Sequence, residues 1–188
     1  TYKVTGAEIK IYPFTTILGD GAEQTIIKQT DASQDYVART VDSGGNTGAN
    51  IGSGSNTVPQ HIDITGITFE SSGSNSGLLL DRAKHVRIVD CQFKSTFAQG
   101  DGAGSGYKGV DAESSGIYTA KHITFDHCTF TGLHYAFSTD YDVESVNFQN
   151  CYFDILYKGI KLGESTDGST AGQANGPRFV RVIGSQFD

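Results

Sequence analysis

The sequence contains neither methionine nor tryptophan, and it has only three cysteines and three prolines among its 188 residues. The odd number of cysteines argues against a disulfide framework. No hydrophobic run reaches the roughly 20 residues of a membrane helix, and no basic start precedes an apolar signal segment. We therefore expect no membrane insertion. Because the chain begins without methionine and ends within a hydrophobic pattern at Phe187, we expect one domain, 1–188, cut from a longer chain.

The chain also lacks an excess of basic residues. Its formal net charge is −7, and acidic and basic residues are interspersed along it. A nucleic-acid-binding surface needs a concentrated basic face, so we expect no nucleic-acid partner. The segment GDGAEQT (19–25) lacks the Lys-Ser/Thr of a phosphate-binding loop, and we expect no cofactor. The 24 glycines and the Tyr and Phe content indicate a β-rich protein.

What the sequence does contain is an internal repeat. Five segments align without gaps: HIDITGITF (61–69), HVRIVDCQF (85–93), HITFDHCTF (122–130), SVNFQNCYF (145–153) and FVRVIGSQF (179–187). The closing Phe residues are 24, 37, 23 and 34 residues apart, which gives a repeat of about 23 residues with two insertions. Apolar residues alternate with a period of two, which predicts strands and not helices.

Each segment has two residues between its two short strands. The second of them is Gly66, Asp90, His127, Asn150 or Gly184. These residue types best tolerate a left-handed backbone, so we predict a tight left-handed corner once per coil. The triplet Asp126-His127-Cys128 resembles a catalytic or metal-binding cluster, but this alignment makes His127 a corner residue and Cys128 an interior residue.

A third strand per coil follows the same phase at Leu78 and Leu80, Ile117 and Thr119, Phe137 and Thr139, and Ile160 and Leu162. Three short strands in a coil of about 23 residues predict an all-β fold, the right-handed parallel β-helix. Cys91, Cys128 and Cys151 then form a reduced, inward-facing column, although a disulfide between neighbouring coils is geometrically possible.

A second column contains His61, His85 and His122, each directly before the first inward aliphatic residue of its coil. Stacked imidazoles suggest a metal site or a pH-sensitive ladder. We favour a plain exposed ladder without metal, because the column continues as Ser145 and Phe179 and lacks carboxylate support.

With this coil pattern, the chain resembles the pectin lyase-like β-helix superfamily, and within it virus tailspikes and tail fibres. TTILGDGAEQTIIK (15–28) is similar to the opening coil of such proteins. The resemblance implies a trimeric shaft that recognises or cleaves host surface polysaccharide. ITFDHCTF is locally similar to the Trp-Ile-Asp-His segment of pectate lyases, but the chain has no tryptophan. The catalytic Arg motif, the calcium-binding carboxylates and the polygalacturonase motifs (Asn-Thr-Asp, Asp-Asp, Gly-His-Gly) have no match either.

Three segments are predicted to be loops, at 42–58, 94–114 and 163–178. The second and third flank one strand column, so we expect them to overhang one long face, where binding sites on rigid scaffolds usually lie. As carbohydrate-binding candidates on that face we name Tyr118, Ser138, Asp140, Tyr141 and Lys161. The acid pairs Asp140 with Asp142 and Asp111 with Glu113 are candidates for glycoside hydrolysis, which needs two carboxyl groups beside the bond.

The leading hypothesis is a virion structural protein, a β-helical segment of a phage tail fibre or tailspike that recognises host polysaccharide. Its partners would be two further copies of the chain and other tail proteins. The alternatives are a polysaccharide-degrading lyase or hydrolase and a bacterial surface adhesin, either of them secreted or at the cell surface. Whether the protein is an enzyme stays open at this point.

Overall fold

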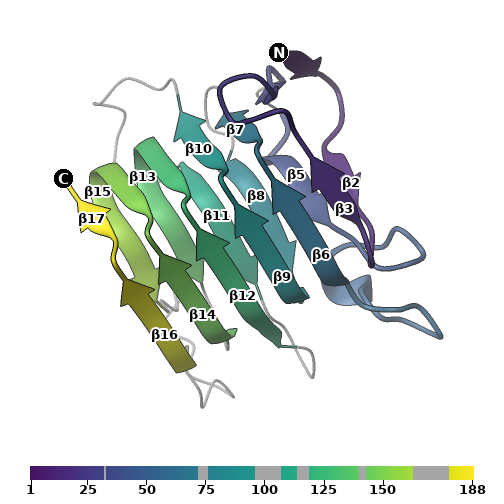
Figure 1. Cartoon of the computed structure of the whole chain (residues 1–188). Helices are drawn as coiled ribbons and strands as arrows, with labels where there is room; N and C mark the ends of the chain where they lie inside the picture. Colours follow the sequence, from purple (N-terminus) through teal and green to yellow (C-terminus); the bar gives the residue numbers. More distant parts are fainter. Residues whose placement is uncertain (32, 72–75, 96–106, 114–118, 140–142, 163–177) are drawn as a thin grey trace.

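The computed structural model describes all residues except 32, 72–75, 96–106, 114–118, 140–142 and 163–177 (Figure 1). All strand pairs are parallel, and they form two sheets that wind around one apolar core. The two termini lie at opposite ends of the stack of coils (Figure 1). This arrangement confirms the predicted parallel β-helix.

The smaller sheet has six strands. In spatial order they are β16 (Arg178–Ile183), β14 (Val143–Gln149), β12 (Ala120–Asp126), β9 (Lys84–Val89), β6 (Gln60–Thr65) and β3 (Thr16–Leu18). Each passes into the larger sheet through a corner. Five of these corners contain two residues each, between β6 and β7, β9 and β10, β12 and β13, β14 and β15, and β16 and β17.

The larger sheet has eleven strands and bends around two sides of the core. One side consists of β1 (Tyr2–Val4), β4 (Ile26–Gln29), β7 (Thr68–Ser71), β10 (Gln92–Ser95), the first half of β13 (Thr129–Thr139), the first half of β15 (Tyr152–Leu162) and β17 (Gln186–Phe187). The other side consists of β2 (Ile9–Ile11), β5 (Tyr36–Thr40), β8 (Ser76–Asp81), β11 (Lys108–Glu113) and the second halves of β13 and β15. The bend in β13 follows Gly132, whose φ is 64°.

The side chains of the repeated Phe column run through the core from coil to coil. Phe69, Phe93, Phe130, Phe153 and Phe187 stand in register on neighbouring strands, and their rings stack with centroids 4.4–5.3 Å apart. Burial of each such side chain stabilises the fold by roughly 1.5–3 kcal/mol. Four of the five are fully buried, and Phe187, on the last strand, is half exposed, so Phe69, Phe93, Phe130 and Phe153 contribute most to the packing of one coil on the next.

The cysteine column is also interior, as predicted. Cys91, Cys128 and Cys151 are buried and reduced, and their thiols lie against backbone carbonyl oxygens of the core. Burial raises the pKa of Cys91 to about 11, so this thiol stays protonated at neutral pH. These cysteines are packing residues.

The predicted left-handed corner is confirmed at every position. Gly66, Asp90, His127, Asn150 and Gly184 have φ between 50° and 67°. His127 is exposed and contacts Asp126, with 2.8 Å between Nδ1 and Oδ1. The triplet Asp126-His127-Cys128 is thus one turn of the solenoid.

A second left-handed column was not predicted. Phe14, His61, His85, His122, Ser145 and Phe179 all have φ between 53° and 61°. They lie where each coil enters the smaller sheet, and all except Phe14 directly precede an inward aliphatic residue. The column mixes Phe, His and Ser, so its residue types share no preference for a left-handed backbone that would have revealed this corner.

Two predictions about the third strand need correction. The strand in register with Leu78 and Phe137 is β11, where Val110 and Ala112 are buried, and the predicted Thr119 lies outside the strands. β11 lies inside the predicted loop 94–114, whose first two residues belong to β10. The glycine-rich composition hid the alternation of Val110 and Ala112. The loop 163–178 ends one residue earlier than predicted, because Arg178 begins β16; Ile117 and residues 163–177 lie outside the described residues.

The described residues include one helix, the single 3-10 turn η1 (Gly48–Asn50) within the predicted loop 42–58. No helix in the described part of the chain is long and apolar enough to cross a membrane.

Candidate functional site

One outward face of the larger sheet gathers the polar residues that the core excludes. We call it the polar face, the outer side of β2, β5, β8, β11 and the second halves of β13 and β15. Its central column, in hydrogen-bonded register, is Lys10, Arg39, Leu79, Asp111, Ser138 and Lys161. Inward neighbours such as Leu78, Val110 and Phe137 pack in the core, so the alternation turns this column away from it.

Asp111 is the centre of the polar face and is fully buried. Lys108 Nζ lies 2.5 Å from its Oδ2, and the Tyr36 hydroxyl donates a hydrogen bond of 3.0 Å to the same oxygen. Burial, followed by the negative charges of Asp111 and Glu113, raises the pKa of Tyr36 far above its ordinary value. The Tyr36 hydroxyl therefore stays protonated and remains a donor.

An ion pair connects this centre to the edge of the face. Arg39 Nη2 donates to Glu8 Oε1 at 3.1 Å, and Arg39 Nε also contacts Glu8 Oε2. The guanidinium carbon of Arg39 lies 5.4 Å from the centroid of the Tyr36 ring, and Glu8 Oε1 accepts the backbone N–H of Tyr36 at 3.0 Å. Glu8, Arg39, Tyr36 and Asp111 are thus linked by direct contacts.

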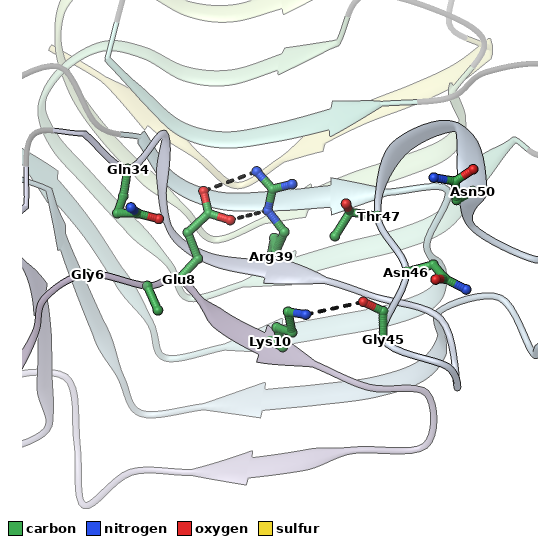
Figure 2. Close-up of a pocket in the computed structure, with 10 residues that line it drawn as sticks. Gly6, Glu8, Lys10, Gln34, Arg39, Gly45, Asn46, Thr47 and Asn50 are labelled. Atoms are coloured by element: carbon green, nitrogen blue, oxygen red, sulfur yellow. Dashed lines mark hydrogen bonds and ion pairs between the residues drawn. The ribbon is translucent and has the colours of Figure 1, made fainter.

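The Glu8–Arg39 pair lies beside an open hollow of about 490 Å³. Figure 2 shows the two side chains facing each other, with Lys10 directed at the carbonyl oxygen of Gly45, 3.3 Å away. The complete lining is Gly6, Ala7, Glu8, Lys10, Gln34, Arg39, Gly45, Asn46, Thr47 and Asn50. It offers cationic, anionic and amide groups within one concave surface.

Two buried carboxylates hold the loop that forms one wall of the hollow. Asp42 accepts hydrogen bonds from the backbone N–H groups of Gly44, Asn46 and Gly52 at 2.9–3.0 Å. Burial alone would raise the pKa of Asp42, but these hydrogen bonds outweigh it and lower the pKa. The loop wall is therefore built by a carboxylate that stays ionised.

Asp81 is the second of these carboxylates. It accepts the backbone N–H of Gly48 at 2.8 Å, and burial raises its pKa. Arg82 Nη1 donates to the carbonyl oxygen of Ile51 at 3.3 Å, which fixes the same loop from the other side.

At the far end of the polar face lies an aromatic and basic group. The ammonium nitrogen of Lys161 is 5.4 Å from the centroid of the Tyr135 ring. The His134 ring stacks on Tyr135 with centroids 4.6 Å apart, and burial together with the charge of Lys158 lowers the pKa of His134. The half-buried Tyr135 ring is thus already in contact with an imidazole ring and an ammonium group.

The predicted site residues divide into two groups. Asp111, Glu113, Ser138 and Lys161 lie on the polar face, as expected, but Asp111 and Ser138 are completely buried. Tyr118, Asp140, Tyr141 and Asp142 lie outside the described residues. The description of Asp111 as a loop residue is wrong, because it stands within β11. Glu113 is in register with Asp81 on the neighbouring strand.

The sequence alone did not point to several residues of this site, among them Glu8, Lys10, Tyr36, Arg39, Asp81, Lys108 and Tyr135. All lie outside the aligned segments, and the first four lie in coils without a closing Phe. The stretch YVART (36–40) carries a weak signal, since Val37, Ala38 and Thr40 are buried and Arg39 between them is turned outward.

The histidine column has a geometry of its own. The rings of His61, His85 and His122 are exposed and stack in parallel, with centroids 4.9 Å apart and interplanar angles of 9° and 16°. A nitrogen lone pair lies in the plane of its ring, so parallel rings cannot direct their lone pairs at one ion. Among the described residues no group of three or more His, Cys, Asp or Glu side chains is placed to hold a metal ion.

The fold agrees with a comparison to known families. Residues 1–175 match the family described as rhamnogalacturonase A/epimerase, pectate lyase-like. The chain belongs to this family. The match confirms the pectin lyase-like part of the resemblance and gives no support to the finer resemblance to virus tailspikes. No curated protein and no solved structure matches the chain.

Membership of the rhamnogalacturonase A/epimerase, pectate lyase-like family directs attention to carbohydrate as the ligand class. It does not by itself assign a reaction, since one fold supports many activities and function must be argued from the site.

Proposed function

We propose that this chain binds a polysaccharide at the two ends of the polar face, in the hollow on β2 and β5 and around Lys161 on β15. The observation that carries the proposal is the hollow beside Glu8 and Arg39, which stands in the same register column as Lys161, with the buried Leu79, Asp111 and Ser138 between them. Six neighbouring strands at about 4.8 Å span roughly 24 Å, enough for several sugar units.

The chemistry of the face suits sugars. Sugar hydroxyl groups both donate and accept, and the lining supplies amides at Gln34, Asn46 and Asn50, a carboxylate at Glu8 and cations at Lys10 and Arg39. At the far end, Lys158 and Lys161 add ammonium donors beside the half-buried Tyr135.

Cleavage of the polysaccharide is the second candidate function, because Asp111 and Glu113 stand two residues apart on one strand. That spacing separates their Cα atoms by about 6.6 Å, within reach of the carboxyl separation of inverting glycosidases. Binding is the better-supported function, because Lys108 and Tyr36 already engage the buried Asp111 carboxylate.

The decisive experiment incubates the protein with a panel of bacterial and plant polysaccharides, and measures both binding and the release of new reducing ends or unsaturated products. Lys10→Ala and Lys161→Ala test the two ends of the face. Their matched controls are Lys3→Ala, exposed on β1, and Arg181→Ala, exposed on the smaller sheet. We expect each site variant to weaken binding several-fold and the controls to bind as the wild type does. Equal losses in sites and controls, or no binding to any polysaccharide, would overturn the proposal.

The finer hypothesis remains the one drawn from the resemblance: a homotrimeric segment of a phage tail fibre or tailspike, assembled with other tail proteins on the virion, that recognises host-surface polysaccharide. An adhesin at a bacterial surface is its alternative. Sedimentation of the purified chain tests the trimer, and antibody labelling of intact phage particles against cell envelopes distinguishes virion from cell surface.

A further inference from the structure

We propose that the stacked ring column Phe14, His61, His85 and His122, here called the histidine ridge, is an acid-sensitive element of the fold. In this proposal, protonation of the ridge destabilises the corner at which three successive coils enter the smaller sheet. The proposal is independent of carbohydrate binding at the polar face.

The geometry of the ridge is the first support. The Phe14 ring lies 5.6 Å from His61 at an interplanar angle of 12°, and the two histidine pairs are each 4.9 Å apart. Neutral imidazoles stack favourably at this distance, but imidazolium ions carry like charges that repel one another. His85 lies between two other histidines, so it is the residue with most to lose on protonation.

The backbone makes the ridge a sensitive place for such repulsion. All four residues are left-handed, with φ between 53° and 60°, a conformation that is unfavourable for residues other than glycine. Stacking of the rings is one of the contacts that hold these residues in it. When repulsion replaces stacking, the residues lose a contact that offsets their backbone strain.

The surrounding charges do not neutralise the positive charge that protonation places on the histidine ridge. On its own strand His85 lies between Lys84 and Arg87, on β6 it faces His61 and Asp63, and on β12 it faces Lys121 and His122. Asp63 stands in register with Arg87, and Glu144, one strand beyond Lys121, lies 4.0 Å from Arg178. The two nearby carboxylates, Asp63 and Glu144, therefore each have an arginine as a neighbour.

The titration of His85 follows from this setting. Burial first, and then the charges of His122, His61, Lys121 and Lys84, lower the pKa of His85 below its ordinary value of 6.5. A base whose pKa is lowered in the folded state binds more protons when unfolded. Its contribution to stability is therefore complete above pH 6.5 and is lost as the pH falls below that value.

The first test follows the ring signals of His85 by NMR between pH 8 and pH 4. We expect a midpoint below 6.5 that rises in His61→Asn and in His122→Asn, because each variant removes a neighbouring charge. Asn tolerates the left-handed backbone, so the corner is kept. His127→Asn, at the other left-handed corner, is the control and leaves the His85 midpoint unchanged. A His85 midpoint that does not move in either ridge variant would overturn the proposal.

The second test measures the midpoint of urea unfolding at pH 7.5 and pH 5. The wild type and His127→Asn should lose stability on acidification, and His85→Asn should lose distinctly less. Amide exchange at the start of β6, β9 and β12 should accelerate in acid more than at the Gly66–Gly184 corner, after correction for the intrinsic rate. Equal acid sensitivity of His85→Asn and the wild type would refute the ridge as the acid-sensitive element.

Discussion

The polar face and the outer side of the smaller sheet are made from the same repeat, yet they treat their outward residues differently. On the smaller sheet the outward column Asp63, Arg87, Thr124, Asn147 and Arg181 is exposed or half-buried throughout. On the polar face Leu79, Asp111 and Ser138 of the corresponding column are buried. The first surface is an ordinary solvated sheet, and the second is buried at its centre and accessible at its two ends.

The difference arises at the edges of the strands. Strands of the smaller sheet end at two-residue corners, which leave no chain to cover the face. The loop between β5 and β6 contains nineteen residues, 41–59, and packs on Asp42 and Asp81 beside the polar face. This loop lies at an edge of the polar face, and the buried carboxylates Asp42 and Asp81 hold its backbone there. Asp42 and Asp81 are thus buried charged groups that hold a loop, whereas the core of the solenoid consists of packed apolar side chains.

Removal of the Asp111 carboxylate, the charge at the centre of the polar face, should show the largest difference in stability between the two faces. Asp111→Ala leaves the Lys108 ammonium and the Tyr36 hydroxyl without their shared acceptor, and loss of one partner of a buried pair is costly. We expect a decrease of about 3 kcal/mol in the free energy of unfolding. Asp63→Ala on the smaller sheet should change it by no more than about 0.5 kcal/mol. Urea unfolding measures both, and similar losses in the two variants would mean that the faces do not differ.

The next largest effect separates two tyrosine hydroxyls. Tyr36→Phe removes the buried hydrogen bond to Asp111 and should cost about 2 kcal/mol, the usual worth of a hydrogen bond to a charged group. Tyr152→Phe removes a hydrogen bond of 2.7 Å to Asp188 in solvent, so its cost should stay below about 0.5 kcal/mol. Thermal unfolding of the two variants gives the comparison, and a Tyr36→Phe protein as stable as the wild type would contradict the role of this bond.

Much of the fold could be predicted from the sequence, because a solenoid repeats its constraints. Each of the five aligned segments places an inward Phe, a small inward residue and a left-handed corner at the same positions. Five repetitions make these positions visible when the segments are aligned. The prediction failed at β11, because this strand lies in a glycine-rich stretch that was assigned to a loop. It also missed the corner at Phe14 and His61, because its column mixes Phe, His and Ser and shows no common preference for a left-handed backbone.

The site could be predicted only in part. The flanking insertions pointed to the face on which Asp111 and Lys161 stand, and its role in binding stays a prediction. The Glu8–Arg39 pair and Tyr36 depend on register between strands 25 or more residues apart, in coils that lack the closing Phe. Nothing in their local sequence sets that register, so only the assembled sheet shows that Tyr36 reaches Asp111.

The smallest predicted effect concerns pH and separates two aspartates. Burial raises the pKa of Asp81 above 3.8, so the folded state binds a proton there more readily than the unfolded chain. The ionised Asp81 carboxylate therefore destabilises the fold once the pH rises through the raised pKa, and it has no such effect below pH 3.8. Asp81→Asn, which can still accept from Gly48, should therefore be somewhat more stable than the wild type at pH 7 and should lose this advantage in acid. Asp63→Asn, on the open sheet, should show no advantage at either pH. Urea midpoints at pH 7 and pH 3.5 decide the matter: a loss of stability in Asp81→Asn at pH 7 would show that the charge of Asp81, and not only its hydrogen bond, holds the loop in place.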